Sequence, residues 1–391
     1  MKTLYNLSLS LIILFSISSC TKTDMQSSPV NAEVSSDAVK VQSILYIGTK
    51  TGFYCLNADN GKTRWHFSPG PGYQQVCSST PTLNSGHVVF NMGDSLYALD
   101  MLTGAKAWAS YSRHFRSALF FYGYRIFAGT PYGVACYNGD NGALIWFHKY
   151  AAVDALQNHN SSPIVINSVV YVGGGADNML YALSADTGDE IWKTHIANSG
   201  ANSSPTVYDS KVYMLGDSSL FVLNAANGNI VMQKQFNFKF SYQAPSIFFN
   251  GFKGLYIAAD SFYCFNPDDA SRKWAFGDAS GASCTTDGFI DFDGIAAYPV
   301  FGNKFYKVNS QTGVPVAGWG NTGELFSDDM IVSNNKLFYR SNTTNTLYAN
   351  SAVDDSPVWT KQFAGTYDGG SAITQNIDGS IILPMVSGNH Y

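Results

Sequence analysis

The sequence predicts an all-β protein, an eight-bladed β-propeller with four antiparallel strands in each blade. The first observation is a nine-residue phrase that recurs eight times, clearly at 57–65, 100–108, 138–146 and 184–192, and more weakly from Asn224, Asn266, Asn309 and Ser351. The second is its mean spacing of about 42 residues, which is typical of radial repeats in an all-β chain. The third is that short runs of β-branched and aromatic residues fill the intervals.

The clearest repeat, residues 160–196, indicates how one blade is built. Strands are predicted at 161–166, 169–172, 179–183 and 190–194, with turns rich in Gly, Asn, Asp and Ser between them. Four strands in one repeat are the content of one propeller blade.

The recurring phrase has a structural role in the last hairpin of each repeat. Its leading Asn or Asp can start the turn, and its glycine takes the left-handed conformation that closes the loop. In the clear copies the glycines are Gly61, Gly104, Gly142 and Gly188. Four residues later, a tryptophan slot on the last strand faces the next blade and holds Trp65, Trp108, Trp146, Trp192, Trp274 and Trp359. We interpret these residues as blade-docking groups, because a large aromatic ring buried between blades contributes about 3–5 kcal/mol.

The alanine-led phrase that ends in Thr-Gly-x-x-x-Trp, as at 185–192, resembles the repeat of PQQ-type, or quinoprotein-like, propellers. The resemblance covers about residues 43–391 and is strongest in the first four repeats. It implies eight blades, each with four antiparallel strands that run from the central axis outward.

The two ends of the repeat region predict how the ring closes. The first phrase follows only two strand-like runs, at 43–48 and 53–56, so its blade lacks an innermost strand. Two runs at 371–375 and 381–385 have no phrase after them. We therefore expect these C-terminal strands to complete the first blade, which removes an exposed sheet edge.

The N-terminus is typical of an exported protein. Residues 1–20 combine a basic start, an apolar run and small residues that end at Cys20, which resembles a bacterial lipobox and predicts acylation of Cys20. An ordinary cleaved signal peptide is the alternative. Residues 21–40 read as a flexible tether, and residues 41–391 as a single propeller domain. The expected location is the bacterial envelope, at the outer membrane, on either its periplasmic or its surface face.

Charge composition indicates which partners to expect. The net charge is −5, only 13% of residues are charged, and no basic stripe occurs, so nucleic acid is not an expected partner.

The cysteines follow the repeat. Cys55, Cys136 and Cys264 share one repeat position with small apolar residues, and their places on separate blades keep them apart. We expect buried thiols rather than disulfides.

The resemblance raises the question of catalysis. Enzymes of this family bind pyrroloquinoline quinone and calcium, and many carry an adjacent cysteine pair over the cofactor. No adjacent cysteine pair, HExxH or G-x-S-x-G motif occurs in this sequence. We therefore expect no catalytic residues, no cofactor and no metal, with a quinone-dependent oxidoreductase as the minor alternative.

Polar residues at the starts of the innermost strands converge on the axis and form the candidate binding surface. They can bind a small ligand or simply line a water-filled tunnel. The candidates are Arg113, His114, Arg116, Asn160, Ser161, Asn202, Ser203, Gln243, Asp328 and Asp329.

The expected function is that of a non-enzymatic envelope lipoprotein, a monomeric rigid scaffold that contacts envelope proteins and reaches the membrane through its lipid anchor. In architecture and anchor it is similar to the lipoprotein subunit of the outer-membrane β-barrel assembly machinery. The alternative is an exported propeller that binds a small ligand or sugar in its axial pocket. Fold analogy alone is weak evidence for either function.

Overall fold

The computed structural model divides into two units, Met1–Lys40 and Val41–Tyr391. The first unit, including Cys20 and the predicted tether, lies outside the described residues. The described residues are 43–49, 51–70, 77, 80–84, 86–111, 117–152, 161–198, 200–238, 240, 245–249, 252–284, 289–290, 296–319, 330–333, 335–341, 344–363, 373–375 and 381–382. Their regular structure consists of β-strands, and none of them belongs to a helix long and apolar enough to span a membrane.

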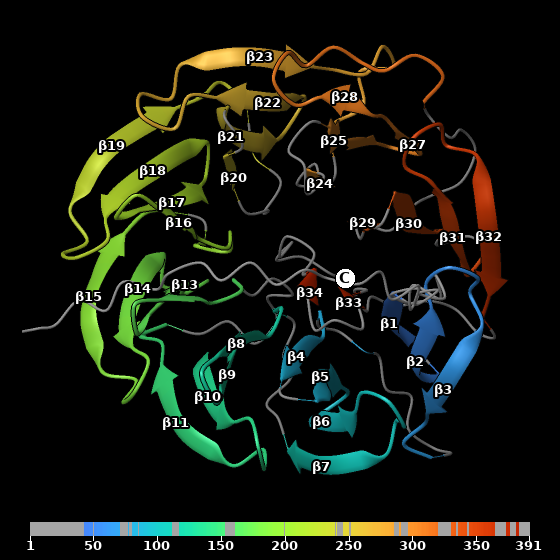
Figure 1. Cartoon of the computed structure of the whole chain (residues 1–391). Helices are drawn as coiled ribbons and strands as arrows, with labels where there is room; N and C mark the ends of the chain where they lie inside the picture. Colours follow the sequence, from blue (N-terminus) through green and yellow to red (C-terminus); the bar gives the residue numbers. More distant parts are fainter. Residues whose placement is uncertain are drawn as a thin grey trace, which may run out of the picture. The chain divides into compact units, whose positions relative to one another are not determined.

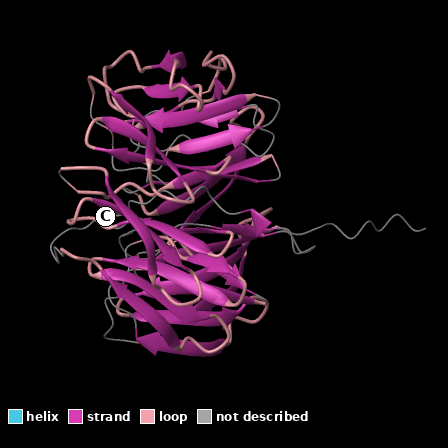
Figure 2. Ribbon diagram, turned by 90° about the vertical axis from the view of Figure 1, so that its left-hand side faces the viewer, coloured by secondary structure: helices cyan, strands magenta, loops and turns pink. Residues whose placement is uncertain are grey.

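The all-β propeller class is confirmed, because antiparallel sheets of the second unit stand around a common axis (Figure 1). The first three blades in chain order contain β1 (Ile44–Thr49), β2 (Gly52–Asn57) and β3 (Thr63–Phe67); β4 (Thr82–Asn84), β5 (His87–Met92), β6 (Ser95–Asp100) and β7 (Lys106–Tyr111); and β8 (Phe120–Tyr122), β9 (Arg125–Thr130), β10 (Gly133–Asn138) and β11 (Leu144–Lys149). Turns and loops lie along the two faces of the ring (Figure 2).

Four further sheets repeat this four-stranded pattern. They contain β12 (Ile164–Ile166), β13 (Val169–Gly173), β14 (Met179–Ser184) and β15 (Glu190–His195); β16 (Thr206–Tyr208), β17 (Lys211–Gly216), β18 (Ser219–Asn224) and β19 (Ile230–Gln235); β20 (Ser246–Phe249), β21 (Lys253–Ala258), β22 (Phe262–Phe265) and β23 (Arg272–Phe276); and β29 (Ile331–Ser333), β30 (Lys336–Ser341), β31 (Thr346–Ser351) and β32 (Pro357–Gln362).

The expectation of eight four-stranded blades is wrong. Within the described residues, seven sheets have four or more strands, and these are the seven full blades. The stretch 289–319, here called the irregular sector, forms instead a three-stranded sheet and a separate hairpin. Its strands are β24 (Phe289–Ile290), β25 (Ala296–Tyr298) and β28 (Val308–Asn309), with β26 (Val300–Phe301) and β27 (Lys304–Phe305) in the hairpin.

Pro299 separates β25 from β26 in the irregular sector. Proline has no backbone N–H to donate to a sheet, so it interrupts a strand. After the phrase, Val308 and Pro315 form an isolated bridge, and Gly318 then takes a left-handed φ of +81°. Pro315 does not itself end the pairing, because Pro357 begins β32 at the equivalent position.

The ring closes through the C-terminal strands. β33 (Ile373–Gln375) pairs with β1, and β34 (Ile381–Ile382) pairs with β33, so the first sheet has the order β3-β2-β1-β33-β34. The inner edge of β1 is therefore paired, as expected, although this blade has five strands rather than four.

Indole rings join successive blades. The Trp65 Nε1–H donates to the carbonyl of Met101 in the next blade, at 3.0 Å. The other five tryptophan slots that hold Trp repeat this bond at 3.0–3.1 Å, with the acceptors Gly139, Ala185, Ala225, Ser310 and Ala58. The bond from Trp359 to Ala58 crosses the point where the ring closes.

Candidate functional site

The described axial residues are hydrogen-bonded parts of the scaffold. Ser161 accepts the N–H of Gly173 at 2.9 Å, and Ser203 donates to the carbonyl of Ser204 at 3.3 Å. Both serines are buried. Arg113, His114, Arg116, Asn160, Gln243, Asp328 and Asp329 lie outside the described residues. A role for this axial set in binding stays a prediction.

Serine hydroxyls near the starts of the innermost strands accept hydrogen bonds from the backbone of the preceding blade. The N–H of Ala118 donates to the hydroxyl of Ser162 at 2.9 Å, and the N–H of Ser162 donates to the hydroxyl of Ser204 at 2.8 Å. The repeated Ser-Ser pairs at 161–162 and 203–204 are therefore a packing signal of the same kind as the recurring phrase.

Asn202 differs from these serines. It is 4% exposed, and its Oδ1 has no hydrogen-bond partner among the described residues. A buried unpaired amide oxygen costs about 1–3 kcal/mol. Asn202 is therefore the member of the described axial set with capacity left for a ligand.

The five cysteines that the structure describes are buried thiols without disulfides: Cys55, Cys77, Cys136, Cys264 and Cys284. Cys55 pairs across its sheet with Trp65, and Cys136 pairs with Trp146. Burial raises the pKa of the Cys55 thiol to about 12. Such a thiol is protonated at neutral pH and is a poor nucleophile. Within the described residues, no group of three or more His, Cys, Asp or Glu side chains is arranged to hold a metal ion.

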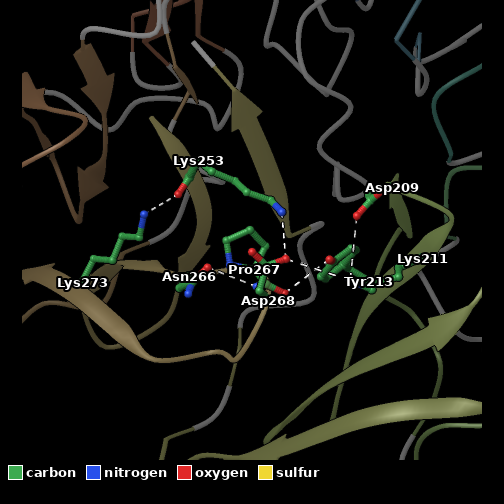
Figure 3. A network of polar contacts seen from close by, with 8 residues as sticks. All are labelled: Asp209, Lys211, Tyr213, Lys253, Asn266, Pro267, Asp268 and Lys273. Carbon is green, nitrogen blue, oxygen red and sulfur yellow. Dashed lines mark hydrogen bonds and ion pairs between the residues drawn. The ribbon is translucent and has the colours of Figure 1, made fainter. Parts of the chain in front are cut away.

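A polar network lies where the β16–β19 and β20–β23 blades meet (Figure 3). Lys253 forms an ion pair with Asp268 at 2.8 Å, and Lys211 lies 4.0 Å from the same carboxylate. The hydrogen bond to Asp268 raises the pKa of Lys253. Tyr213 donates to the carbonyl of Pro267 at 3.3 Å, so the network ties one blade to the turn of the next.

This network has structural counterparts elsewhere in the ring. Arg125 of β9 pairs with Asp186 in the next blade at 2.6 Å, and Lys336 of β30 pairs with Asp59 at 2.8 Å. In each case the first residue of a blade's second strand reaches the phrase of the following blade. Lys211, the first residue of β17, takes the same place beside Asp268 of the following blade, at 4.0 Å. We therefore assign the network around Asp268 to blade docking rather than to a functional site.

An open groove lies at the joint between the β12–β15 and β16–β19 blades. Its volume is about 430 Å³, within the range of about 300–1,000 Å³ found for small-ligand pockets. Residues 195–198, at the end of β15 and just after it, form one wall, the turn at 216–219 forms another, and β18 and β19 contribute the rest. The lining residues are His195, Ile196, Ala197, Asn198, Gly216, Asp217, Ser218, Ser219, Phe221, Ile230, Gln233 and Gln235.

The groove lining is polar and carries little charge. Asp217 accepts hydrogen bonds from the backbone N–H of Asn198 at 2.8 Å and from its side chain at 3.4 Å, which holds the two walls together. Gln233 and Gln235 are exposed, and neither side chain hydrogen-bonds to a described residue. With no Lys or Arg in the lining, the groove suits a neutral ligand that offers hydrogen-bond donors and acceptors.

Sequence reasoning missed this groove. The axial residues attracted attention because polar side chains begin several repeats. The groove instead combines the end of β15, the turn at 216–219 and part of β19, which come together only through the packing of two blades.

These features define a β-propeller of the PQQ type. The chain belongs to the family described as Outer membrane protein assembly factor BamB, whose model matches residues 18–179 and 133–237, more than half of the chain.

Individual relatives are more distant. Tetrathionate hydrolase of Acidithiobacillus ferrooxidans is 28% identical over 200 residues, which cover 49% of this chain and only 35% of that protein. BamB of Moraxella catarrhalis has a similar fold, with a TM-score of 0.59 and 17% identity over 77% of this chain and 96% of that one. Apo AztD of Citrobacter koseri has a TM-score of 0.61 and 10% identity, over 87% and 99% of the two chains. These structural likenesses concern the fold alone.

Proposed function

We propose that this protein is a non-enzymatic scaffold of the bacterial envelope, anchored at the outer membrane through Cys20, whose propeller rim binds another envelope protein. The family description, an assembly factor, supports a role in protein contacts. The described thiols and ion pairs have structural roles, which is consistent with a scaffold.

The observation that carries this proposal is an apolar strip on the outer strands of three successive blades. Its members are 40–55% exposed: Leu144 and Ile145 of β11, Ile191 of β15, and Ile230 and Val231 of β19. These strands lie on the rim of the ring (Figure 1). At the position of Ile145, Ile191 and Val231, two other repeats carry the charged residues Arg64 and Lys273, and the remaining three carry Ala107, Val316 and Val358. The strip is therefore distinguished by three successive apolar positions and by the additional exposed residues Leu144 and Ile230. Exposed apolar side chains gathered in one region are typical of protein interaction surfaces.

The test is capture of partners from detergent-solubilised envelope with the full-length protein. We expect one reproducible partner, which is lost with the triple variant Ile145→Lys, Ile191→Lys and Val231→Lys, since lysine already occupies this position in β23. Val358→Lys, at the equivalent position of β32, is the matched control and should retain the partner. If no partner is captured reproducibly, or if the triple variant recovers the partner as well as the wild type does, the rim strip is not the binding surface.

The relative named tetrathionate hydrolase favours an enzyme as the second candidate. Two activity assays of the purified protein test whether it is non-enzymatic. One uses tetrathionate, and the other uses an alcohol or sugar after addition of pyrroloquinoline quinone and calcium. Turnover in either assay would replace the scaffold proposal with a catalytic one.

The lipid anchor has its own test. Mass spectrometry of the mature N-terminus should find an acylated Cys20, and Cys20→Ala should release the protein from the membrane fraction. An unmodified N-terminus at another residue would indicate the ordinary signal peptide instead.

A further inference from the structure

Two blades share a hydrogen bond between an aspartate and a tyrosine hydroxyl. Asp177 accepts the hydroxyl of Tyr181, and Asp260 accepts the hydroxyl of Tyr263 at 2.8 Å. In each blade the aspartate lies in the turn between the second and third strands, and the tyrosine belongs to the third strand. The carboxylate of this turn is therefore a place where a hydroxyl group is bound.

The blade at the groove has the aspartate of this turn but not the hydroxyl. Phe221 holds the position of Tyr181 and Tyr263, because all three pair across the sheet with the residue after the tryptophan slot. Asp217, which is exposed in the corresponding turn, accepts hydrogen bonds from the backbone and side chain of Asn198. A carboxylate can accept about four hydrogen bonds. Asp217 can thus also accept a hydroxyl from a bound molecule.

Two carboxamides provide further polar groups of the groove. Gln233 and Gln235 lie two residues apart on β19, so their side chains leave the same face of the strand about 7 Å apart. A carboxamide both donates and accepts hydrogen bonds, and so does a hydroxyl group. A ligand with several hydroxyl groups therefore matches both glutamines and the nearby Asp217 carboxylate.

The rest of the lining selects against charge. It contains no Lys or Arg, so an anionic ligand would meet the Asp217 carboxylate with no cation to offset the repulsion. Ile230 adds exposed apolar surface at one side of the groove. Neutral saccharides combine many hydroxyl groups with apolar C–H groups, and the volume of about 430 Å³ lies in the range for small ligands.

We propose that the groove binds a neutral saccharide. Its hydroxyl groups donate to Asp217 and exchange hydrogen bonds with Gln233 and Gln235, while its C–H groups contact Ile230. This binding site is additional to the proposed scaffold function and does not depend on it.

The test follows isoleucine δ1-methyl NMR signals of the full chain during separate titrations with maltotriose, cellotriose and mannotriose. Ile196 and Ile230 line the groove, while Ile47, buried at another joint, is the reference. We expect saturable shifts of the two groove signals with at least one of these probes, and a constant Ile47 signal. If none of the three saccharides shifts the groove signals, the proposal is wrong.

Variants of the polar lining test the hydrogen bonds. Gln235→Ala should weaken binding about threefold or more, whereas Gln362→Ala, at the equivalent position of β32, should match the wild type. Asp217→Asn keeps an oxygen for the Asn198 N–H but removes the charge that strengthens a bond from a hydroxyl, so it should weaken binding at least fivefold.

Phe221→Tyr is the matched variant for the hydroxyl. It supplies to Asp217 the group that Tyr181 supplies to Asp177, so it should compete with the ligand and weaken binding at least threefold. An unchanged melting temperature checks that each variant is folded. Wild-type affinity in Asp217→Asn, Gln235→Ala or Phe221→Tyr would overturn the proposal.

A peptide is the competing occupant, and acetyl-Gly-Ala-Gly-Ala-Gly-amide is its probe. It offers amide groups without hydroxyls and should leave the groove signals unshifted. Shifts as large as those caused by the saccharides would assign the groove to peptides instead.

Partner capture separates this site from the scaffold function. Asp217→Asn should still recover the envelope partner, because the groove is distinct from the residues of the triple variant. Loss of the partner in Asp217→Asn would make the groove part of the protein interface and overturn the saccharide site, whereas saccharide binding without any captured partner would leave the site and remove the scaffold.

Discussion

A tryptophan and a glycine on neighbouring blades act as one unit in this protein. A Cβ added to Gly61, Gly104, Gly142, Gly188, Gly228 or Gly313 would come within 2.5–2.7 Å of a Trp side chain from the preceding blade. Where the slot holds Met232 or Ala317 instead, the next blade carries Ala270 or Asp355 at the glycine position. The glycine is thus required by the indole as well as by its own turn.

Gly104→Ala tests this pairing at one residue. We expect a loss of about 1–3 kcal/mol in the free energy of unfolding, because the new methyl group overlaps the Trp65 ring and the backbone has a φ of +72°. Trp65→Ala alone should cost about 3–5 kcal/mol. Denaturant unfolding measures both, and the two losses should add to more than the loss in the double variant. Full additivity would contradict the pairing.

His66 gives a prediction for pH. It stacks on Tyr54 with ring centroids 4.1 Å apart, and burial lowers its pKa below the ordinary value of 6.5. Protons therefore bind the unfolded chain first, so stability falls as pH drops below about 6.5. The melting temperature should decrease less between pH 7.5 and 5.5 in His66→Gln than in the wild type. Identical decreases would show that His66 does not contribute.

At this scale the sequence identifies the tryptophans and glycines by their spacing. It does not reveal which glycine contacts which indole, because that contact joins residues 34–42 positions apart, or 298 positions for Trp359 and Gly61, through the order of the blades in space. The environment of Asn202 could not be predicted either. Its burial and its unpaired oxygen depend on neighbours that the repeat pattern does not specify.

Among the structural elements, the joint between the β16–β19 and β20–β23 blades is stabilised in another way. Its slot holds Met232 instead of an indole. Phe236 packs there against Phe265 and Phe238 against Tyr263, while Phe240 packs edge-on against Phe236 and Phe238. On the phrase side, the network around Asp268 joins the same two blades (Figure 3). Exposed ion pairs contribute only about 0–1 kcal/mol each, so the aromatic cluster has the larger effect.

Restoring the common pair at this joint gives a second stability prediction. Met232→Trp alone should destabilise the protein by about 1–3 kcal/mol, because the indole would overlap the Ala270 Cβ. Adding Ala270→Gly should remove that loss, with a coupling energy of about 1–3 kcal/mol in a double-mutant cycle. A coupling energy near zero would mean that the two positions do not meet.

Strand positions could be predicted well where the repeats are regular, as in 160–196. The irregular sector could not, because Asn309 and Gly313 keep the phrase recognisable while Pro299 interrupts the inner strands and Gly318 takes a left-handed conformation after the phrase. The groove was missed for another reason: its blades are regular, and its lining comes from two blades whose packing the repeat pattern does not specify.

For the whole molecule, the sequence predicts the propeller class and the C-terminal strands that join the first blade, but not the number of full blades. Counting phrases overestimates that number, since a phrase encodes one hairpin turn and not the three strands before it. Closure depends on Ile373, whose partner Tyr46 lies near the other end of the chain.

Removal of residues 370–391 tests closure. Without β33 and β34, the inner edge of β1 is left unpaired, and an open edge promotes association with other chains. We expect a lower melting temperature and aggregates in size-exclusion chromatography. A monomeric truncated protein with an unchanged melting temperature would contradict closure by these strands.

The pairing of Ile44 with Gln375 also has a consequence for folding. The two residues stand at opposite ends of the propeller sequence, so the first blade stays unfinished until the last repeat has emerged into the compartment where the chain folds. Until then β1 has a strand edge able to pair with any neighbour. Chaperones that bind unfolded chains would therefore matter most for this protein before its C-terminal strands have docked.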